Sequence, residues 1–294
     1  MQRQVTSLLQ ASTLWFAALW LPGSLVHAQE GAELLDSEAP VNWALAPVLG
    51  TGWYTLGDGR DAFIIYAPYT QTLREVDAGG TGLEAAGWYI NWAGSLGLFE
   101  LDLDPGIIDP DNFGTFSFTP GIEAEIPMGA RWSLRPYLHF GRGVSIGDGP
   151  EAWIYYGGLK SRTWLDDDQR LSLMVGAGYA GFDPQGGRSG GLWTLYTGGE
   201  YRLPLEPVSG PALDLFMQAG YRAIDDTADF GLRSDSNALK AIGDTVEVGL
   251  AMGPSTGEFR WGFLAVERIG LTWNFEPSGD FNSITLDFRS WFRQ

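Results

Sequence analysis

TFSFTPGIEAEI, residues 115–126, places apolar side chains at the even positions and small or polar side chains at the odd positions. After a short link at 128–130, RWSLRPYLHF at 131–140 repeats the alternation, with Trp132 and Leu138 on the apolar side. Since side chains alternate across a β-strand, each stretch predicts a strand with one apolar and one polar face. A three-residue turn at 128–130 would then place Glu123 opposite Arg135 on the polar faces.

The same period of two continues along the chain, and no helical period competes with it. Residue 267, a glutamate, breaks the phase of its segment, so we expect a β-bulge there. Residues 91–94 could form a turn that splits another segment. The predicted strands are 43–55, 60–73, 82–103, 113–127, 131–146, 150–165, 169–183, 190–203, 211–223, 243–253, 259–275 and 281–292.

The length of these strands and the placement of their aromatic residues favour a membrane over water. Many segments exceed the ~9–11 residues that a tilted strand needs to cross a bilayer. If the C-terminus lies in the periplasm, the short links 128–130, 166–168 and 254–258 lie there too, and the longest connection, 224–242, lies outside. The aromatic side chains then form two girdles, one of Trp132, Tyr201, Trp261 and Phe292, the other of Trp153, Tyr179, Trp193, Tyr221 and Trp273.

An even number of strands can close into a barrel and leave no unpaired edge, as lipid requires. The sequence therefore predicts an all-β fold, a closed antiparallel transmembrane β-barrel of 12 strands. A water-soluble periplasmic β protein is the alternative, and 10 or 14 strands would fit the pattern nearly as well.

Composition excludes several function classes. The chain of 294 residues carries a formal charge of −18, which argues against nucleic-acid binding, because that needs clustered Lys and Arg. It has no Cys, so thiol catalysis, disulfides and Cys-based metal sites are excluded. The two His residues leave little room for a His-based metal site, and we expect neither a metal nor a cofactor.

The N-terminus has the pattern of an export signal. Arg3 is the only charge in residues 1–28, an apolar run follows, and Val26 and Ala28 place small residues at the positions that signal peptidase prefers. We therefore expect a cleaved signal peptide at 1–28, a short periplasmic or plug segment at 29–42, and the barrel at 43–294. This predicts the outer membrane of the Gram-negative cell envelope.

The last predicted strand resembles the aromatic C-terminal signal of bacterial outer-membrane barrels, through Leu286, Phe288 and Phe292. Arg293 and Gln294 follow the last aromatic residue, which departs from that signal. A twelve-strand barrel with this ending resembles the translocator domain of autotransporters, in particular solitary barrels that lack a passenger. The resemblance implies recognition by the barrel-assembly machinery, with outer-membrane lipid and lipopolysaccharide as further partners.

Charged side chains of both signs fall on the polar faces. The lumen candidates for ion pairs or a constriction are Glu123, Glu125, Arg131, Arg135, His139, Arg162, Arg170, Glu200, Arg202, Asp214, Arg222, Asp287 and Arg289. They could form a charged constriction, as in a porin-like channel for small solutes. They could equally form ion pairs that fill the lumen of a structural barrel, since twelve strands lie between filled eight-strand barrels and open porins.

Catalysis would have to use His139, the only His outside the export signal. Outer-membrane phospholipases and deacylases carry a Ser two residues after the His, where this chain has Gly141. Omptin-like proteases carry an Asp two residues before it, where this chain has Tyr137. The sequence therefore predicts no enzymatic activity. Acidic residues in the outer loops could bind divalent cations that bridge lipopolysaccharide phosphates, but a solvated acidic rim is the preferred interpretation.

Overall fold

The structure is a computed structural model, and it describes residues 47–48, 50–56, 61–77, 79–99, 113–145, 151–185, 189–205, 212–226, 243–261, 264–279 and 281–293. The chain divides into two units, 1–36 and 37–294, and every described residue belongs to the second. The expected signal peptide and the segment 29–42 lie outside the described residues.

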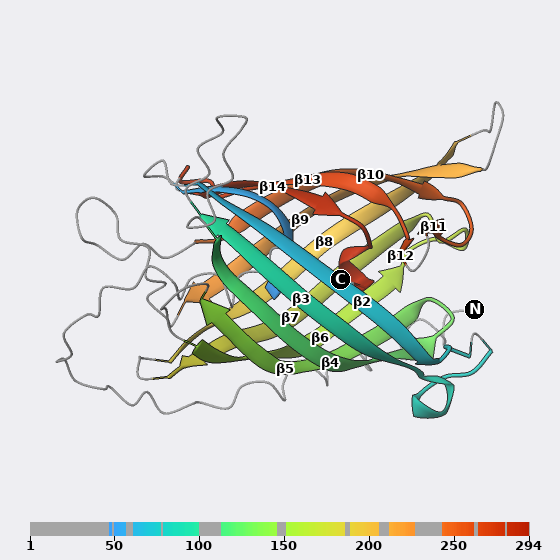
Figure 1. Cartoon of the computed structure of the whole chain (residues 1–294). Coiled ribbons are helices and arrows are strands. Elements are labelled where there is room, and N and C mark those ends of the chain that lie inside the picture. Colours follow the sequence, from blue (N-terminus) through green and yellow to red (C-terminus); the bar gives the residue numbers. More distant parts are fainter. Residues whose placement is uncertain are drawn as a thin grey trace. The chain divides into compact units, whose positions relative to one another are not determined.

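Twelve antiparallel strands close into a barrel, in the order β1-β14-β13-β10-β9-β8-β7-β6-β5-β4-β3-β2 (Figure 1). The predicted fold and strand number are therefore confirmed. The barrel strands are β1 (Thr51–Leu56), β2 (Asp61–Arg74), β3 (Gly87–Phe99), β4 (Phe113–Gly129), β5 (Trp132–Ser145), β6 (Glu151–Trp164), β7 (Leu171–Pro184), β8 (Gly190–Leu205), β9 (Leu213–Asp226), β10 (Thr245–Pro254), β13 (Ile269–Phe275) and β14 (Phe281–Asp287).

Four short elements of the described part of the chain are not strands of the wall. Strands β11 (Phe259–Trp261) and β12 (Leu264–Val266) pair only with each other, in the connection between β10 and β13. Two 3₁₀ turns, η2 (Leu83–Ala85) and η4 (Trp291–Arg293), precede β3 and follow β14. No helix in the described part of the chain is long and apolar enough to cross a membrane. We call the end of the barrel where β14 ends and η4 begins the near end, and the opposite end the far end.

The period of two in the sequence becomes two faces of the wall. In β7, Leu171, Leu173 and Val175 are exposed on the outside, whereas Ser172 and Met174 between them are buried. Neighbouring strands keep this phase, because Leu171 pairs with Tyr201. The outer surface is therefore apolar and the inner surface is mainly polar, the reverse of a water-soluble barrel.

Several strands begin or end elsewhere than the pattern predicts. Strand β3 continues unbroken through residues 91–94, so the alternative of a turn there is wrong. The predicted strand 259–275 is divided, and the N–H groups of Glu267 and Arg268 both bond the carbonyl of Phe288, which is the hydrogen-bond pattern of a β-bulge. Strand β14 ends at Asp287, and β1 begins at Thr51 after a helical turn at 47–48.

The turn between β4 and β5 is also tighter than predicted. Strand β4 continues to Gly129, and the register shifts between Pro127 and Gly129. Glu123 consequently lies opposite Tyr137, so the predicted Glu123–Arg135 register was wrong by two residues. Arg135 still reaches Glu123, because its long side chain bridges a diagonal neighbour on the same face.

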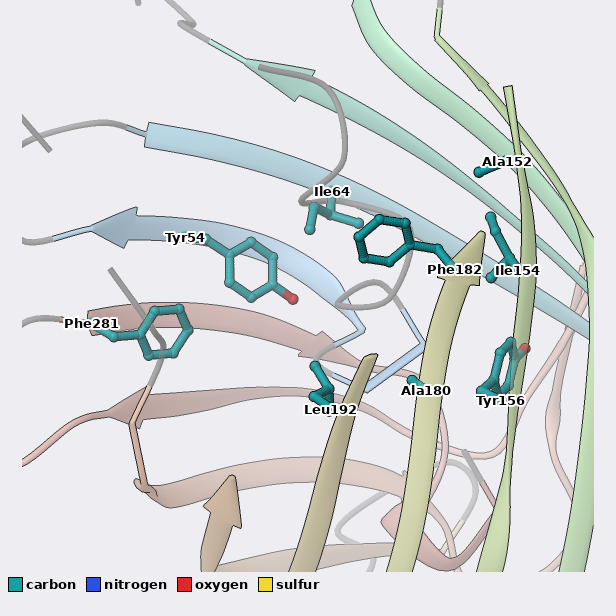
Figure 2. Packing of buried hydrophobic residues seen from close by; sticks show 9 residues of the cluster. All are labelled: Tyr54, Ile64, Ala152, Ile154, Tyr156, Ala180, Phe182, Leu192 and Phe281. Carbon is teal, nitrogen blue, oxygen red and sulfur yellow. The ribbon is translucent and has the colours of Figure 1, made fainter. Parts of the chain in front are cut away.

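An apolar cluster lies in the far half of the interior, beside buried polar side chains such as Ser95, Ser117 and Thr245. Side chains from six strands pack there around Ile64, Ile154, Phe182 and Leu192, and Figure 2 shows them pointing into the barrel. Val48, from the turn that precedes β1, packs against this cluster. Buried side chains therefore occupy part of the far half of the lumen.

Candidate functional site in the barrel lumen

Arg135 on β5 is the centre of the polar half of the lumen. Its Nε and Nη2 donate to Glu123 Oε2 at 2.9 and 2.7 Å, and its Nη1 donates to Glu125 Oε2 at 3.3 Å. Arg162 Nη2 donates to Glu125 Oε1 at 3.5 Å. Glu123, Glu125 and Arg135 are all buried, so this is a paired charge network in which no carboxylate depends on water for a partner.

His139 joins the same network. Its Nε2 lies 3.3 Å from Glu123 Oε1, its Nδ1 lies 3.2 Å from the carbonyl oxygen of Thr119, and its ring stacks on Tyr156 at 4.3 Å. Asn91 Nδ2 also donates to Glu123 Oε1, at 2.9 Å. Because both ring nitrogens face oxygen acceptors, His139 is held as a member of the hydrogen-bond network.

A second group of contacts connects β8, β9 and β10 to the segment that precedes β1. The hydroxyl of Tyr196 donates to Glu247 Oε1 at 2.5 Å, and Arg222 Nη2 donates to Glu247 Oε2 at 3.4 Å. Arg222 Nη1 donates to the carbonyl oxygen of Val48 at 2.6 Å. The Arg222 contact places the carbonyl of Val48 inside the barrel.

A third group lies on the β8–β14 side. Arg268, fully buried, pairs with Glu200 and donates from Nη2 to Gln218 Oε1 at 3.0 Å. Gln218 Nε2 donates in turn to Asp287 Oδ2 at 3.1 Å. Nearer the rim, Arg202 pairs with Asp214. The bulge at Glu267 turns Arg268 inward, so the break in the period of two supplies this group with its cation.

The 3₁₀ turn η4 folds into the near end of the lumen. The ring of Trp291 stacks on Tyr196 with 3.8 Å between centroids, and its carbonyl accepts from Lys160 Nζ at 3.2 Å. Phe292 is fully buried, with the Arg162 guanidinium 4.4 Å from its ring centroid. Phe292 therefore does not belong to an aromatic girdle, and that prediction was wrong, because the chain turns inward at Ser290 instead of extending β14.

A small cavity remains between Val48 and Trp291. Its volume is about 50 Å³, which is room for a few water molecules, and its wall includes Tyr66, Tyr137 and Lys160. The apolar cluster lies on the far side of this cavity, and Trp291 of η4 lies on its near side. In the described part of the chain, a small, partly open cavity lined by both polar and apolar side chains therefore lies inside the barrel.

Most of the predicted lumen residues do lie inside the barrel. Those buried or half-buried on the inner face are Glu123, Glu125, Arg135, His139, Arg162, Glu200, Arg202, Asp214, Arg222, Asp287 and Arg289. Arg131 and Arg170 were wrongly assigned. Both lie in exposed turns at the near end, where Arg131 pairs with Asp167 and Arg170 with Asp168, because β5 and β7 begin only after them.

The structure adds residues that the list of candidates lacks. Asn91, Tyr196 and Gln218 lie on inward-facing positions and could have been found by applying the period of two to uncharged residues. Arg268 and Trp291 follow breaks in the period, so alternation alone could not place them.

Charged groups at the near end have shifted pKa values. Backbone N–H groups of Leu171 and Arg170 bond the carboxylate of Asp166 and hold its pKa below the usual range. Burial alone would raise the pKa of Glu267, but the Arg293 guanidinium, 3.0 Å away, lowers it. Within the described ranges, no group of three or more His, Cys, Asp or Glu is arranged to hold a metal ion.

The side chains on the outer surface indicate which environment surrounds the barrel wall. Of the predicted girdle residues, those that lie exposed or half-buried on the outside are Trp132, Trp153, Tyr179, Trp193, Tyr201, Tyr221 and Trp273. Trp261 lies in β11, outside the barrel wall, and its side chain lies outside the described part of the chain. A closed sheet with an apolar, aromatic-rich exterior and charges inside is suited to lipid. The chain is a transmembrane β-barrel.

The chain is similar to solved structures at low sequence identity. The chain is similar to the crystal structure of the β domain of the Bordetella autotransporter BrkA, with 8% identity and a TM-score of 0.49, over 80% of this chain and 94% of that one. It is also similar to the siderophore receptor PirA from Pseudomonas aeruginosa, with 10% identity and a TM-score of 0.34, over 79% of this chain and 37% of the receptor. No family model matches the chain, and no curated protein matches its sequence.

Proposed function

We propose that this protein is a bacterial outer-membrane barrel with a sealed lumen, similar to a translocator barrel without a passenger, and that its role is structural. The observation that supports this most directly is the filling of the lumen. A cluster of apolar side chains lies in the far half, paired charges occupy the near half, and η4 packs inside the near end. A solute would have to displace paired buried charges to pass, which is costly.

In the outer membrane, the two ends of the barrel would face different compartments. The near end, with the short turns and η4, faces the periplasm, and the far end faces outward. Outer-membrane lipid contacts the apolar exterior, and lipopolysaccharide lies against the outer rim. The barrel-assembly machinery inserts the chain. Phe288, 38% exposed on the outside, is the aromatic residue nearest the end of β14 that remains available on the surface of the folded barrel.

Single-channel conductance in planar bilayers tests the sealed lumen. We expect the purified protein to insert, as shown by heat-modifiable migration on gels, and to give no large stable openings. A sixteen-strand porin serves as the conducting control. Large, stable openings of the unmodified protein would contradict the sealed lumen and would favour a channel for small solutes.

A narrow pore is the alternative, and the polar cavity favours it. The cavity is lined by tyrosine hydroxyls and by Lys160 and Arg222, so it can hold water in the middle of the membrane. Small, anion- or cation-selective steps in the same bilayers would support this narrow pore. Complete absence of such conductance steps would contradict the narrow pore and support the structural role.

The proposal includes no catalytic role for His139. Its ring nitrogens face Thr119 and Glu123, and neither faces a hydroxyl that it could activate. We expect cells with His139→Ala to keep an unchanged composition of envelope lipids, measured by mass spectrometry. A change in lipid A acylation or phospholipid content that matches loss of the whole protein would contradict this and would indicate an enzyme.

A further inference from the structure

The hairpin of β13 and β14 makes one side of the barrel wall low. Each of its strands has seven residues, whereas β4 has 17 and β5, β6 and β7 have 14 each (Figure 1). A tilted strand needs ~9–11 residues to cross a bilayer. The hairpin is therefore shorter than the hydrocarbon core that the long strands span.

Hydrogen bonds define both ends of this hairpin. At the far end, the N–H of Glu276 bonds the carbonyl of Phe281, where the chain turns. At the near end, the N–H groups of Glu267 and Arg268 bond the carbonyl of Phe288, and the chain then turns into the lumen as η4. The described strands of the preceding connection, β11 and β12, pair with each other and add no row to this part of the wall. Neither strand of the hairpin continues along the wall beyond these bonds.

The outer face of β14 is apolar over a short distance only. Ile284, Leu286 and Phe288 are exposed on the outside. The next outward position toward the far end is Asn282, whose amide oxygen accepts a hydrogen bond from Trp273 Nε1 on β13. An amide is costly to bury in hydrocarbon, and Trp with a bonded N–H is typical of the membrane interface. The pair therefore marks the level at which the hydrocarbon ends on this side.

The two sides of the wall differ in apolar height. From Asn282 to Phe288 the chain advances six residues, which at ~3.3 Å per residue and a tilt of ~40° is about 15 Å along the barrel axis. On β4, the exposed apolar residues extend from Phe116 to Met128, which by the same geometry is about 30 Å. The hydrocarbon core of a bilayer is ~30 Å thick. It matches β4 and exceeds the height of the hairpin.

We propose that the β13–β14 hairpin is a membrane-thinning face, beside which the lipids form a thinner hydrocarbon core than around the rest of the barrel. A bilayer meets a short apolar surface by thinning, by extended side chains or by oligomerisation of the protein. The outward positions of the hairpin carry no Lys or Arg that would extend to the headgroups. They are apolar except for Asn282, so they suit acyl chains in composition and fall short only in height. The inference rests on the proposed location in the outer membrane and adds an effect of the barrel on the surrounding lipid.

Depth-dependent fluorescence quenching tests this thinning. The chain has no Cys, so a single-Cys variant carries one bimane label at a chosen position. Asn282→Cys and Phe288→Cys label the two ends of the outer face of β14, in vesicles of dioleoylphosphatidylcholine mixed with lipids brominated at defined depths. We expect both labels to lie at the edge of the hydrocarbon core. Without thinning, labels ~15 Å apart in a core of ~30 Å leave at least one of them about 7 Å or more below the edge.

The long strand β4 supplies the matched control. Labels at Phe116→Cys and Met128→Cys should both lie at the edge of the core with or without thinning, and Ile122→Cys between them should report the centre. Absence of quenching by any lipid at Ile122→Cys would contradict the membrane location and with it the proposed function. This outcome differs from failure of the thinning alone, in which the β4 labels behave as expected.

A second test pair lies on β13. Ile269→Cys and Phe275→Cys cover the case in which a substitution in β14 prevents folding, which heat-modifiable migration reveals. In folded protein, a hairpin label about 7 Å or more below the edge, while the β4 labels lie at the edge, would overturn the proposal. Loss of quenching at Ile284→Cys at every depth would also overturn it, because a second copy of the chain would then cover the hairpin in place of lipid.

Discussion

Replacing Arg135 by Met tests whether the lumen network stabilises the barrel. Met keeps most of the length and apolar stem of Arg135 but removes the charge. Both Glu123 and Glu125 then lose their strongest partner while they remain buried. The lost contacts are three hydrogen bonds at 2.7, 2.9 and 3.3 Å.

Breaking a buried ion pair by removing one partner costs about 3–5 kcal/mol, because an uncompensated charge remains inside. The unfolding equilibrium constant should therefore rise by a factor of about 10² to 10⁴. His139, Asn91 and Arg162 still contact the two carboxylates, which places the expected value near the lower end of this range. Adding Glu123→Gln to Arg135→Met should restore part of the loss, since it removes one of the unpaired charges.

Urea unfolding in lipid vesicles, followed by tryptophan fluorescence, measures the change in free energy of unfolding. Arg170→Met is the matched control, because Arg170 pairs with Asp168 at 3.5 Å with both side chains largely exposed. Such a pair contributes about 0–1 kcal/mol. If Arg135→Met destabilised the barrel no more than Arg170→Met, the pairing of Arg135 with Glu123 and Glu125 would not be a source of stability. Displacing these paired charges from the lumen would then not be costly.

Three further outcomes are expected. Phe292→Ala should lower the free energy of unfolding by about 3–5 kcal/mol, as for a buried core Phe. Phe288→Ala, on the outer surface, should lower it clearly less. Equal losses in the same urea assay would place Phe292 on the lipid side. Tyr196→Phe removes the hydroxyl that donates to buried Glu247 and should cost about 1–3 kcal/mol, and an unchanged unfolding midpoint would contradict that hydrogen bond. The pKa of Asp166 is lowered in the folded state. The carboxylate therefore stabilises the fold above its ordinary pKa of 3.8, and this contribution is lost as the pH falls through the folded pKa. Asp166→Asn should abolish this acid-dependent part of the stability, measured by urea unfolding at a series of pH values.

Alternation of side chains was enough to predict the barrel, because each lipid-facing strand must keep one apolar face from rim to rim. The strands β4 to β9 therefore lie close to their predicted bounds. The same signal misplaced the strand ends near the closure of the barrel. Trp291 and Phe292 are aromatic, as expected of a lipid-facing strand, but their side chains pack inside the lumen. Periodicity does not distinguish an aromatic residue that faces lipid from one that faces the lumen.

The charged lumen residues were predictable for a similar reason, since a charge on a lipid-facing strand has to point inward. Arg131 and Arg170 show where this reasoning ends, because parity assigns a face only within a strand, and both residues lie in turns. Arg268 is an inward residue that the alternation did not predict, because the β-bulge beside it shifts the phase of the pattern by one residue. The filling of the lumen depends on side-chain lengths and diagonal contacts, such as Arg135 to Glu123, that no one-dimensional pattern records.

The buried position of Phe292 has a consequence for the order of assembly. Its ring lies under the guanidinium groups of Arg162 and Arg135, which come from β6 and β5 on a different part of the wall from β14. This contact crosses the lumen, so we expect it to form once the wall has curved enough to bring η4 against β5 and β6. Protection of Phe292 from solvent would then report the curvature of the folding wall.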